Sequence, residues 1–272
     1  MITIAVLSQK GGVGKTLTSA NVAAALADQG LKVLMADFDP QADLSASWGL
    51  DDDDPRPRIE NFLDSSGRDL RDAVVAVSED RDIGLLATGY ERLRQQTSRL
   101  LAGDGSELAR LLAPLHDEVD VALIDTPAGD TVFGRQAIVA ADEAIVPMLP
   151  GFHELRAMTR ALDVIEARAE HERTQLGLLG VLVVNADPRW RSTKEYAHHL
   201  AQMERANEIS LFETVIPRHQ PVTEHARFGL PTVWLRPSCS VAVAYRQVAV
   251  EVRERLGRRV PAVISSATSG AS

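Results

Sequence analysis

The sequence predicts an α/β fold: a single domain built on a mostly parallel sheet with helices on both faces. Apolar segments of strand length alternate with segments of helical periodicity, an order that generates parallel strands joined by helical crossovers. The strands are apolar throughout, as in sheets that are covered on both faces. The polar motifs directly follow strands, and ligands of such sheets bind beyond the C-terminal strand ends. We therefore expect one shared functional site at that edge.

Apolar periodicity and turn residues place the individual elements. Strands are expected at residues 2–7, 31–36, 83–87, 119–124, 144–149, 178–184, 212–216 and 232–235. Helices are expected at 16–28, near 70–77, over 92–112 with an interruption at 103–105, and at 153–171, 193–207 and 241–256. Residues 51–58 are predicted as an acidic loop. The domain is expected to span residues 1–258, and the small, polar segment 259–272 is expected to be a disordered tail.

The composition suits one sizeable domain. The chain has 272 residues, of which 45% are hydrophobic and 25% are charged. Its single cysteine, Cys239, excludes an intramolecular disulfide and a CxxC metal or iron–sulfur site. No secretory signal precedes the first strand, and no apolar run approaches the ~20 residues of a membrane span, so a cytoplasmic location is expected.

The net charge of −9 is unevenly distributed along the chain. Residues 1–184 carry 17 Lys and Arg against 30 Asp and Glu, whereas residues 185–272 carry 12 against 8. Local fields matter more for binding than the total charge, so this acidic protein can still present a basic face. Charge alone does not distinguish such a face from basic residues scattered over solvated helices.

A glycine-rich loop, KGGVGKT at residues 10–16, joins the first strand to the first helix. Such a loop presents backbone N–H groups and a helix N-terminus to phosphates. Lys15 is placed to reach the β- and γ-phosphates, and the Thr16 hydroxyl is placed to bind Mg²⁺. The ordinary phosphate-binding loop has a glycine where this chain has Gln9, and this chain adds a second lysine, Lys10. Two lysines within one short loop are a specific signal in so lysine-poor a chain.

Two carboxylates that follow strands complete the pattern of a phosphoryl-transfer site. Asp39, in the segment DFDPQ at residues 37–41, is placed to hold the attacking water near a γ-phosphate. Asp125 ends the apolar strand VALID at residues 121–125, a pattern that binds Mg²⁺ directly or through water. The alternative is that Asp39 marks a turn before proline and that Asp125 merely ends a strand. The phosphate-binding loop upstream favours the catalytic interpretation.

The doubled lysine resembles the deviant Walker A loop of the ParA/MinD superfamily, and DFDPQ resembles the switch I segment of ParA proteins. The resemblance covers residues 1–256. It implies an ATPase in which Lys10 crosses an ATP-dependent sandwich homodimer to the partner's phosphates, Asp39 is the hydrolytic carboxylate and Asp37 is structural. The implied catalytic residues are Lys10, Lys15 and Asp39, and the implied Mg²⁺ contacts are Thr16, Asp39 and Asp125.

The implied nucleotide contacts lie in two parts of the chain. The late segment TVIPR, residues 214–218, resembles the family segment whose proline lies against adenine, with His219 where asparagine is common. In switch II, PAGD at residues 127–130 replaces the family's two prolines. Position 17, often threonine in the family, is leucine here and contributes mainly its backbone N–H. The predicted cofactor-binding residues are Lys10, Gly11, Gly12, Val13, Gly14, Lys15, Thr16, Leu17, Pro217 and His219.

Basic residues of the late region are candidates for non-specific contact with double-stranded DNA, because DNA-binding ParA proteins use this region of the dimer. A sequence-independent binder needs only to neutralise phosphates, and its affinity falls steeply with salt. The alternative for each residue is an ordinary surface side chain, and for Arg218 also a brace of the nucleotide pocket. The candidates are Arg189, Arg191, Lys194, Arg218, Arg227 and Arg246.

The resemblance predicts a nucleoid-associated ATPase that segregates plasmid or chromosomal DNA. ATP would build the DNA-bound dimer, and a ParB-like centromere-binding partner would stimulate its weak hydrolysis and release it. One alternative is a ParA-like ATPase that positions another cargo. Another is a MinD-like membrane switch, but the proline and missing aromatics after residue 259 argue against membrane contact. A third is a metabolic ATP-dependent ligase such as dethiobiotin synthetase, which shares the fold.

Overall fold

The computed structural model of the chain describes residues 1–50, 52–63, 69–187, 191–206, 209–218 and 229–259. In these ranges seven strands form one sheet in the order β3-β4-β2-β5-β1-β6-β7. Neighbouring strands are parallel, except that β3 and β4 pair antiparallel at one edge. The mostly parallel sheet is therefore confirmed. The strands are β1 (Ile2–Val6), β2 (Val33–Asp37), β3 (Val74–Ala76), β4 (Ile83–Leu86), β5 (Val121–Asp125), β6 (Glu143–Met148) and β7 (Gly177–Val183).

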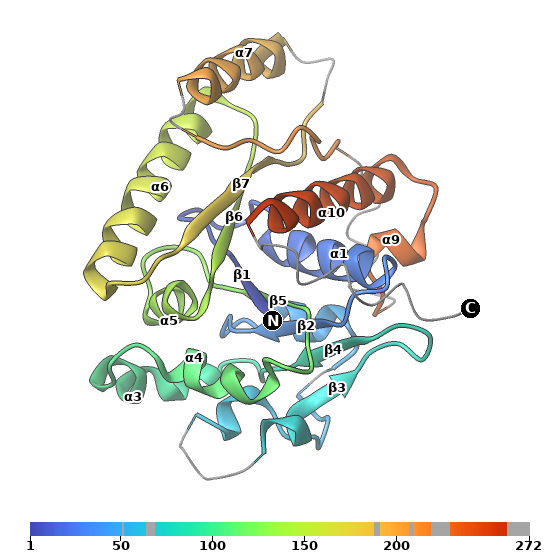
Figure 1. The fold of residues 1–272 in the computed structure, drawn as a ribbon, viewed down its shortest axis with the longest axis vertical. Coiled ribbons are helices and arrows are strands. Elements are labelled where there is room, and N and C mark those ends of the chain that lie inside the picture. Colours follow the sequence, from blue (N-terminus) through green and yellow to red (C-terminus); the bar gives the residue numbers. More distant parts are fainter. Residues whose placement is uncertain (51, 64–68, 188–190, 207–208, 219–228, 260–272) are drawn as a thin grey trace.

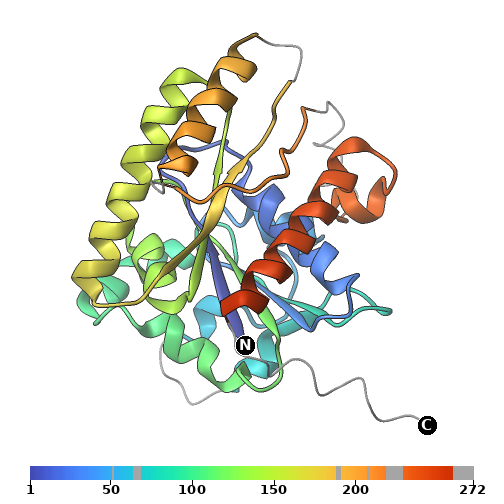
Figure 2. The same cartoon turned by 45° about the horizontal axis from the view of Figure 1, so that its top comes forward.

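Helices cover both faces of the sheet, as Figures 1 and 2 show. On one face α1 (Lys15–Ala27) packs against α10 (Ser240–Arg259) and α9 (Thr232–Leu235). The other face carries α3 (Thr97–Ala102), α4 (Glu107–Leu112), α5 (Val132–Ala140) and α6 (Phe152–Glu172), and α7 (Arg191–Arg205) packs on α6. The short helix α2 (Asp43–Ser47) follows β2, and 3₁₀ turns occupy Ile59–Asn61, Leu70–Ala73, Leu93–Gln96 and Ala113–Leu115.

Alternation along each strand separates two hydrophobic cores. In β1, Ile4 belongs to the core under α1 and α10, whereas Ala5 belongs to the core under α5 and α6. In β5, Leu123 and Ile124 divide between the two cores in the same way. Successive strand residues point to opposite faces, so a strand buried on both sides must be apolar at every position. This requirement explains why the central strands could be located as continuous apolar runs.

Two predicted strands are wrong. Residues 232–235 form helix α9, in which Val233 N donates a hydrogen bond to Asn21 Oδ1 of α1 at 3.0 Å. Packing against α1 and α10 thus outweighs the β-propensity of this short segment. Residues 212–216 add no strand to the described sheet. Isolated bridges from Leu211 to Val181 and from Pro217 to Ala186 instead hold this segment along β7.

The helix expected near residues 70–77 is also wrong, because a 3₁₀ turn there leads into the edge strand β3. The helix predicted over residues 92–112 begins later than expected, because Leu93–Gln96 is a 3₁₀ turn and α3 starts at Thr97, whereas its interruption near 103–105 is confirmed. The remaining predicted strands and helices lie within three residues of their expected bounds. Helix α10 ends at Arg259, and residues 260–272, predicted as a tail, lie outside the described ranges. Among the described helices, none combines the length and apolarity that a membrane crossing requires.

A tryptophan pair joins the end of α2 to α9. The rings of Trp48 and Trp234 meet edge to face, with centroids 5.4 Å apart at an interplanar angle of 83°. Trp234 Nε1 donates to Asp28 Oδ1 at 3.1 Å, and the Arg81 guanidinium lies 4.6 Å from the Trp234 ring centroid. Aromatic edge contacts and cation–π contacts are both favourable, so this cluster fixes α9 against the segment that follows β2.

Candidate nucleotide-binding site

The loop between β1 and α1 forms an open cradle. Gly12 and Gly14 adopt left-handed conformations with φ of 73° and 79°, and Gly14 is the N-cap of α1. A Cβ atom added at Gly11 or Gly12 would meet nothing within 4 Å among the described residues. In the described structure, α1 also begins without a capping side chain and without an acidic residue in its first turn. Such a helix N-terminus favours a bound anion.

A cavity of about 1000 Å³ lies over this loop, at the C-terminal ends of the strands. Its walls come from the loop and α1, from the segment after β2, from α3 and from the start of α5. This volume is sufficient for a nucleotide. The structure therefore brings together, around one cavity, the predicted site residues Gly11, Gly12, Gly14, Lys15, Thr16, Leu17 and Asp39.

Behind the loop, Asp125 accepts two hydroxyl hydrogen bonds from α1. Thr16 Oγ1 donates to Asp125 Oδ2 at 2.7 Å, and Ser19 Oγ donates to Asp125 Oδ1 at 3.0 Å. Burial raises the pKa of Asp125 to about 6, although the two hydroxyls and Lys15 oppose that shift. Carboxylate and hydroxyl oxygens are hard ligands of the kind Mg²⁺ prefers. Sequence reasoning missed Ser19, which lies one helical turn after Lys15.

The two aspartates of switch I differ in environment. Asp37 ends β2 opposite Asp125 in the strand register and is fully buried. Burial, and next the neighbouring Asp125, hold the pKa of Asp37 well above its usual range. The Asp39 carboxylate lines the cavity, and its Oδ1 accepts a hydrogen bond from Gln41 N at 2.9 Å. The geometry thus gives Asp37 a place in the framework and Asp39 access to a ligand.

The two lysines of the loop face different surroundings. Lys15 is 8% exposed and lines the cavity. Lys10 has a 53% exposed side chain, and its Nζ lies 3.0 Å from Glu154 Oε1 near the start of α6. Lys10 and Val13 line a small neighbouring cavity with Glu154 instead of the main one. Nothing in the local sequence pointed to Glu154, because 144 positions separate it from Lys10.

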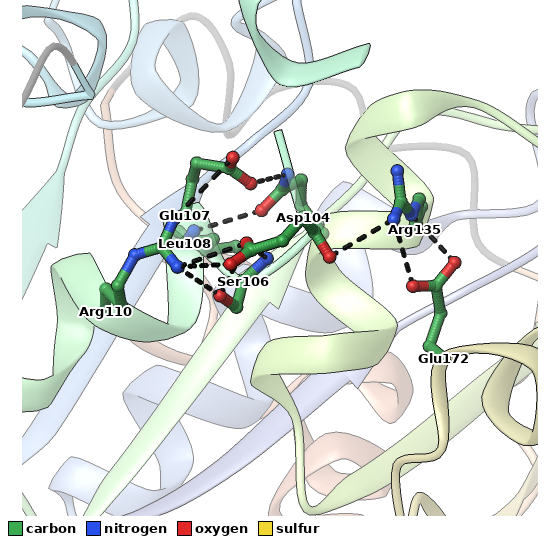
Figure 3. Close-up of polar contacts among 8 residues, drawn as sticks. Asp104, Ser106, Glu107, Leu108, Arg110, Arg135 and Glu172 are labelled. Atoms are coloured by element: carbon green, nitrogen blue, oxygen red, sulfur yellow. Dashed lines mark hydrogen bonds and ion pairs between the residues drawn. The ribbon is translucent and has the colours of Figure 1, made fainter. Parts of the chain in front are cut away.

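The switch II loop is tied to the helices behind it. Gly129 N donates to Ser8 O at 3.0 Å, and Arg168 Nη2 donates to both oxygens of Asp130 at 2.9 and 2.8 Å. Figure 3 shows the next contacts outward: Arg135 of α5 reaches Glu172 of α6 at 2.7 Å and the backbone carbonyl of Asp104 before α4 at 3.2 Å. The loop that departs from the family pattern is therefore tied to α6 through Arg168, and α6 is tied to α5 through the Glu172–Arg135 contact.

The late segment approaches the loop through β7. Arg218 N donates to Ala186 O at 2.8 Å, and Ala186 N donates to Ile216 O at 3.0 Å, which fixes Pro217 beyond the end of β7. The Cβ position of Gly14 lies 3.8 Å from the Val184 side chain, so this end of β7 adjoins the loop. Pro217 is half-buried there, and His219 lies outside the described residues.

The predicted DNA contacts are only partly described. Arg189 and Arg227 lie outside the described residues, and Arg191 and Lys194 lie in α7 with side chains that are also outside them. Arg218 is exposed. The Arg246 guanidinium of α10 is hydrogen-bonded to the backbone. Its Nη1 and Nη2 donate to the carbonyls of Pro237 and Val233 at 2.7 and 2.5 Å.

Comparison with known proteins identifies the family. The family model described as AAA domain matches residues 1–178. An uncharacterized protein of Mycobacterium tuberculosis is 30% identical over 93% of this chain and 79% of its own length. The chromosome partitioning protein ParA of Caulobacter vibrioides is 28% identical over 93% of this chain and 94% of its own.

Two solved structures have a similar fold and are also similar in sequence to this chain. The cell division ATPase MinD of Pyrococcus furiosus superimposes with a TM-score of 0.75 at 26% identity, over 93% of this chain and 98% of that one. Cobyrinic acid a,c-diamide synthase from Mycobacterium smegmatis, solved with a bound ATP analog and magnesium, gives 0.76 at 29% identity, over 92% and 93%. With its lysine-doubled loop and its fold, the chain belongs to the ParA/MinD superfamily of P-loop ATPases.

Proposed function

We propose that this chain is a ParA-type ATPase that segregates DNA. It binds ATP with Mg²⁺, forms a sandwich homodimer that binds double-stranded DNA non-specifically, and leaves the DNA on hydrolysis. The supporting observation is the division between the two lysines: Lys15 lines the cavity, whereas Lys10 lies outside its lining, with a 53% exposed side chain paired to Glu154. A loop that serves only its own nucleotide needs one lysine.

The residues around the cavity fit Mg²⁺ and ATP. The glycine cradle and Lys15 are suited to hold the triphosphate, and Thr16 and Asp125 supply oxygen ligands for the metal. Bound ATP supplies the γ-phosphoryl group. The Asp39 carboxylate orients the attacking water, and Pro217 with His219 borders the adenine. Catalysis of this kind depends on positioning and charge neutralisation more than on covalent chemistry.

Lys10 couples the nucleotide to the dimer in this proposal. In its ion pair with Glu154 the Lys10 side chain is 53% exposed and the Glu154 side chain is 23% exposed, and pairs that solvent reaches contribute only ~0–1 kcal/mol. The ammonium group can therefore leave Glu154 at little cost and move to the phosphates of the partner subunit. A ligand that the dimer binds more tightly than the monomer stabilises the dimer, so loss of the γ-phosphate that Lys10 contacts weakens the dimer.

The DNA face and the partner are inferred from the family. The late basic residues, among which Arg218 is exposed, are proposed to neutralise DNA phosphates once two subunits lie together. A ParB-like partner is proposed to order switch I or switch II and so to accelerate a slow intrinsic hydrolysis. The protein would then work in the cytoplasm at the nucleoid, without contacting a membrane.

The decisive test is Lys10→Ala, with Lys32→Ala as the matched control. Lys32 is exposed at the other end of β2, away from the cavity. We expect the wild type and Lys32→Ala to dimerise with a non-hydrolysable ATP analogue in analytical ultracentrifugation and to bind DNA in the same conditions. Lys10→Ala should stay monomeric and lose at least ~10-fold in DNA affinity. A monomer binds DNA with one basic surface, whereas the dimer binds it with two that are linked. Undiminished DNA binding by Lys10→Ala without ATP at low salt would contradict the mechanism.

A metabolic ligase is the second candidate, because the chain is 29% identical to the solved structure of cobyrinic acid a,c-diamide synthase from Mycobacterium smegmatis. Such an enzyme would transfer phosphate to a carboxyl substrate, and its ATP turnover would depend on that substrate. Measuring ATP turnover with DNA and a ParB-like protein, and separately with small carboxylic acids, separates the two functions. If only a carboxylic acid stimulated ATP turnover, the protein would be a ligase and not a DNA-segregation ATPase.

A further inference from the structure

The buried Asp37 carboxylate fixes both ends of the switch I segment. Its Oδ1 accepts a hydrogen bond from Asp39 N at 3.2 Å, and its Oδ2 accepts from Ser45 N at 2.8 Å and from Ser45 Oγ at 2.6 Å. Asp37 and Ser45 are both inaccessible to solvent. One carboxylate therefore closes the loop that runs from the end of β2 into α2, and Asp39 lies within that loop.

The Ser45 hydroxyl links this hydrogen-bond network to two further segments, one after β4 and one around residues 58–60. Thr88 N, just beyond β4, donates to Ser45 Oγ at 2.9 Å, and Thr88 Oγ1 donates to Glu60 Oε2 at 3.0 Å. Arg58 Nη1 donates to Thr88 O at 2.9 Å. Ser45, Thr88, Glu60 and Arg58 are all buried. Buried polar groups connected in this way rigidify their surroundings, because breaking one bond leaves its partner unsatisfied in a dry environment.

The segment after β4 also holds switch I through a second set of contacts. Glu91 N donates to Pro40 O at 2.8 Å, and Gln41 Nε2 donates to Glu91 Oε1 at 3.2 Å. Ala42 and Glu91 both have left-handed backbones, with φ of 56° and 57°. Non-glycine residues hold this conformation only where the surrounding structure over-determines it, and such positions are typical of functional segments.

We propose that Ser45 and Thr88 are positioning residues for Asp39, with Ser45 acting through Asp37 and Thr88 anchoring Ser45 to Glu60. The inference rests on the proposed hydrolysis of ATP at Asp39. A carboxylate that orients water must be held within a fraction of an ångström, and a 1 Å displacement costs ~100-fold in rate. The hydrogen bonds of Asp37, Ser45 and Thr88 hold the backbone of the Asp39 segment in place. The side of Asp39 that faces the cavity stays open to the nucleotide.

The first test compares Ser45→Ala with Tyr245→Phe. Tyr245 is fully buried in α10, and its hydroxyl lies 3.2 Å from Thr18 Oγ1, so Tyr245→Phe also removes one buried hydroxyl contact. We expect Ser45→Ala to lower kcat ~10- to 100-fold while KM for ATP stays within ~2-fold, because Asp39 shifts but the phosphate cradle does not. Tyr245→Phe should leave kcat and KM within ~2-fold.

The second test uses Thr88→Val and Thr88→Ser. Valine has the shape of threonine but no hydroxyl to donate to Glu60, whereas serine keeps the hydroxyl. Thr88→Val should lower kcat ~3- to 10-fold at unchanged KM, and Thr88→Ser should restore it to within ~2-fold of the wild type. All variants are assayed at a temperature at which circular dichroism shows each to be folded.

The outcomes separate this inference from the proposed function. If the wild type hydrolyses no ATP under any condition, the proposed function fails. If the wild type hydrolyses ATP and folded Ser45→Ala and Thr88→Val keep its kcat, the positioning role is overturned while the proposed function stands. Equal losses in kcat for Thr88→Val and Thr88→Ser would also overturn the role of the hydroxyl.

Discussion

The two lysines of the phosphate-binding loop lie five residues apart and have opposite environments. Lys15 is 8% exposed and faces the cavity, within electrostatic reach of Asp125. Lys10 is half-exposed and is held by one ion pair to Glu154. A buried cation is fixed in its final position before any ligand arrives, whereas an exposed ion pair can be exchanged. This difference supports the proposed division of labour, in which Lys15 binds the nucleotide of its own subunit and Lys10 that of the partner subunit.

The largest expected effect comes from Lys15→Ala. Removing the buried ammonium deletes charge-assisted hydrogen bonds to the triphosphate, so ATP affinity should fall ~10- to 100-fold. Lys10→Ala, measured at a concentration where the protein is monomeric, should change ATP affinity by less than ~3-fold, since Lys10 does not line the main cavity. Isothermal titration calorimetry checks both values. Equal losses in the two variants would show that both lysines serve the same nucleotide.

Arg218 and Arg246 of the late region also differ in exposure: Arg218 is exposed, whereas Arg246 is partly buried and donates to two backbone carbonyls. Arg218→Ala should lower DNA affinity ~3- to 10-fold and reduce the slope of log K against log salt by about one, if Arg218 neutralises one phosphate. Arg246 is already bonded to two carbonyls, so Arg246→Ala should lower the free energy of unfolding by ~1–2 kcal/mol and leave DNA affinity within ~2-fold. Fluorescence anisotropy and chemical denaturation measure the two quantities. A DNA defect in Arg246→Ala without a stability change would reverse the assignment.

The smallest effect is expected from Glu154→Gln. The substitution removes the carboxylate that competes for Lys10, so the protein concentration at half-dimerisation with an ATP analogue should fall ~2- to 5-fold, the equivalent of one exposed ion pair. Glu166→Gln, at an exposed position of the same helix, is the matched control and should leave dimerisation unchanged. Weaker dimerisation in Glu154→Gln would mean that Glu154 supports the dimer interface instead of competing with it.

The parts of the fold that could be predicted are those with a local cause. The central strands appear as apolar runs because both of their faces are buried, and the loop at residues 10–16 is visible because its glycines must adopt left-handed conformations. Residues 232–235 could not be predicted correctly, since contacts with Asn21 and α10 decide their conformation. The edge strand β3 is only three residues long, which is too short for a periodicity signal.

In the candidate site, too, the residues of local motifs could be predicted and those that depend on distant partners could not. The motif residues that line the cavity could be predicted because a single loop and two strand ends carry them. Ser45, Thr88, Glu60 and Glu154 could not, because each has a hydrogen-bond partner that is distant in sequence. The Ser45–Thr88 and Lys10–Glu154 contacts span 43 and 144 positions, and only the folded structure brings such partners together.

The edge-to-face contact of Trp48 with Trp234 gives this chain a built-in optical reporter. Trp48 directly follows the short helix that carries Ser45, and its ring packs on Trp234 of α9, a helix that also contacts α1. Any displacement of switch I when nucleotide enters would change the distance between two indoles and therefore their emission. Of the three tryptophans, replacing Trp190 by phenylalanine would assign the signal to this pair. Stopped-flow mixing with nucleotide could then time such a displacement without an attached dye.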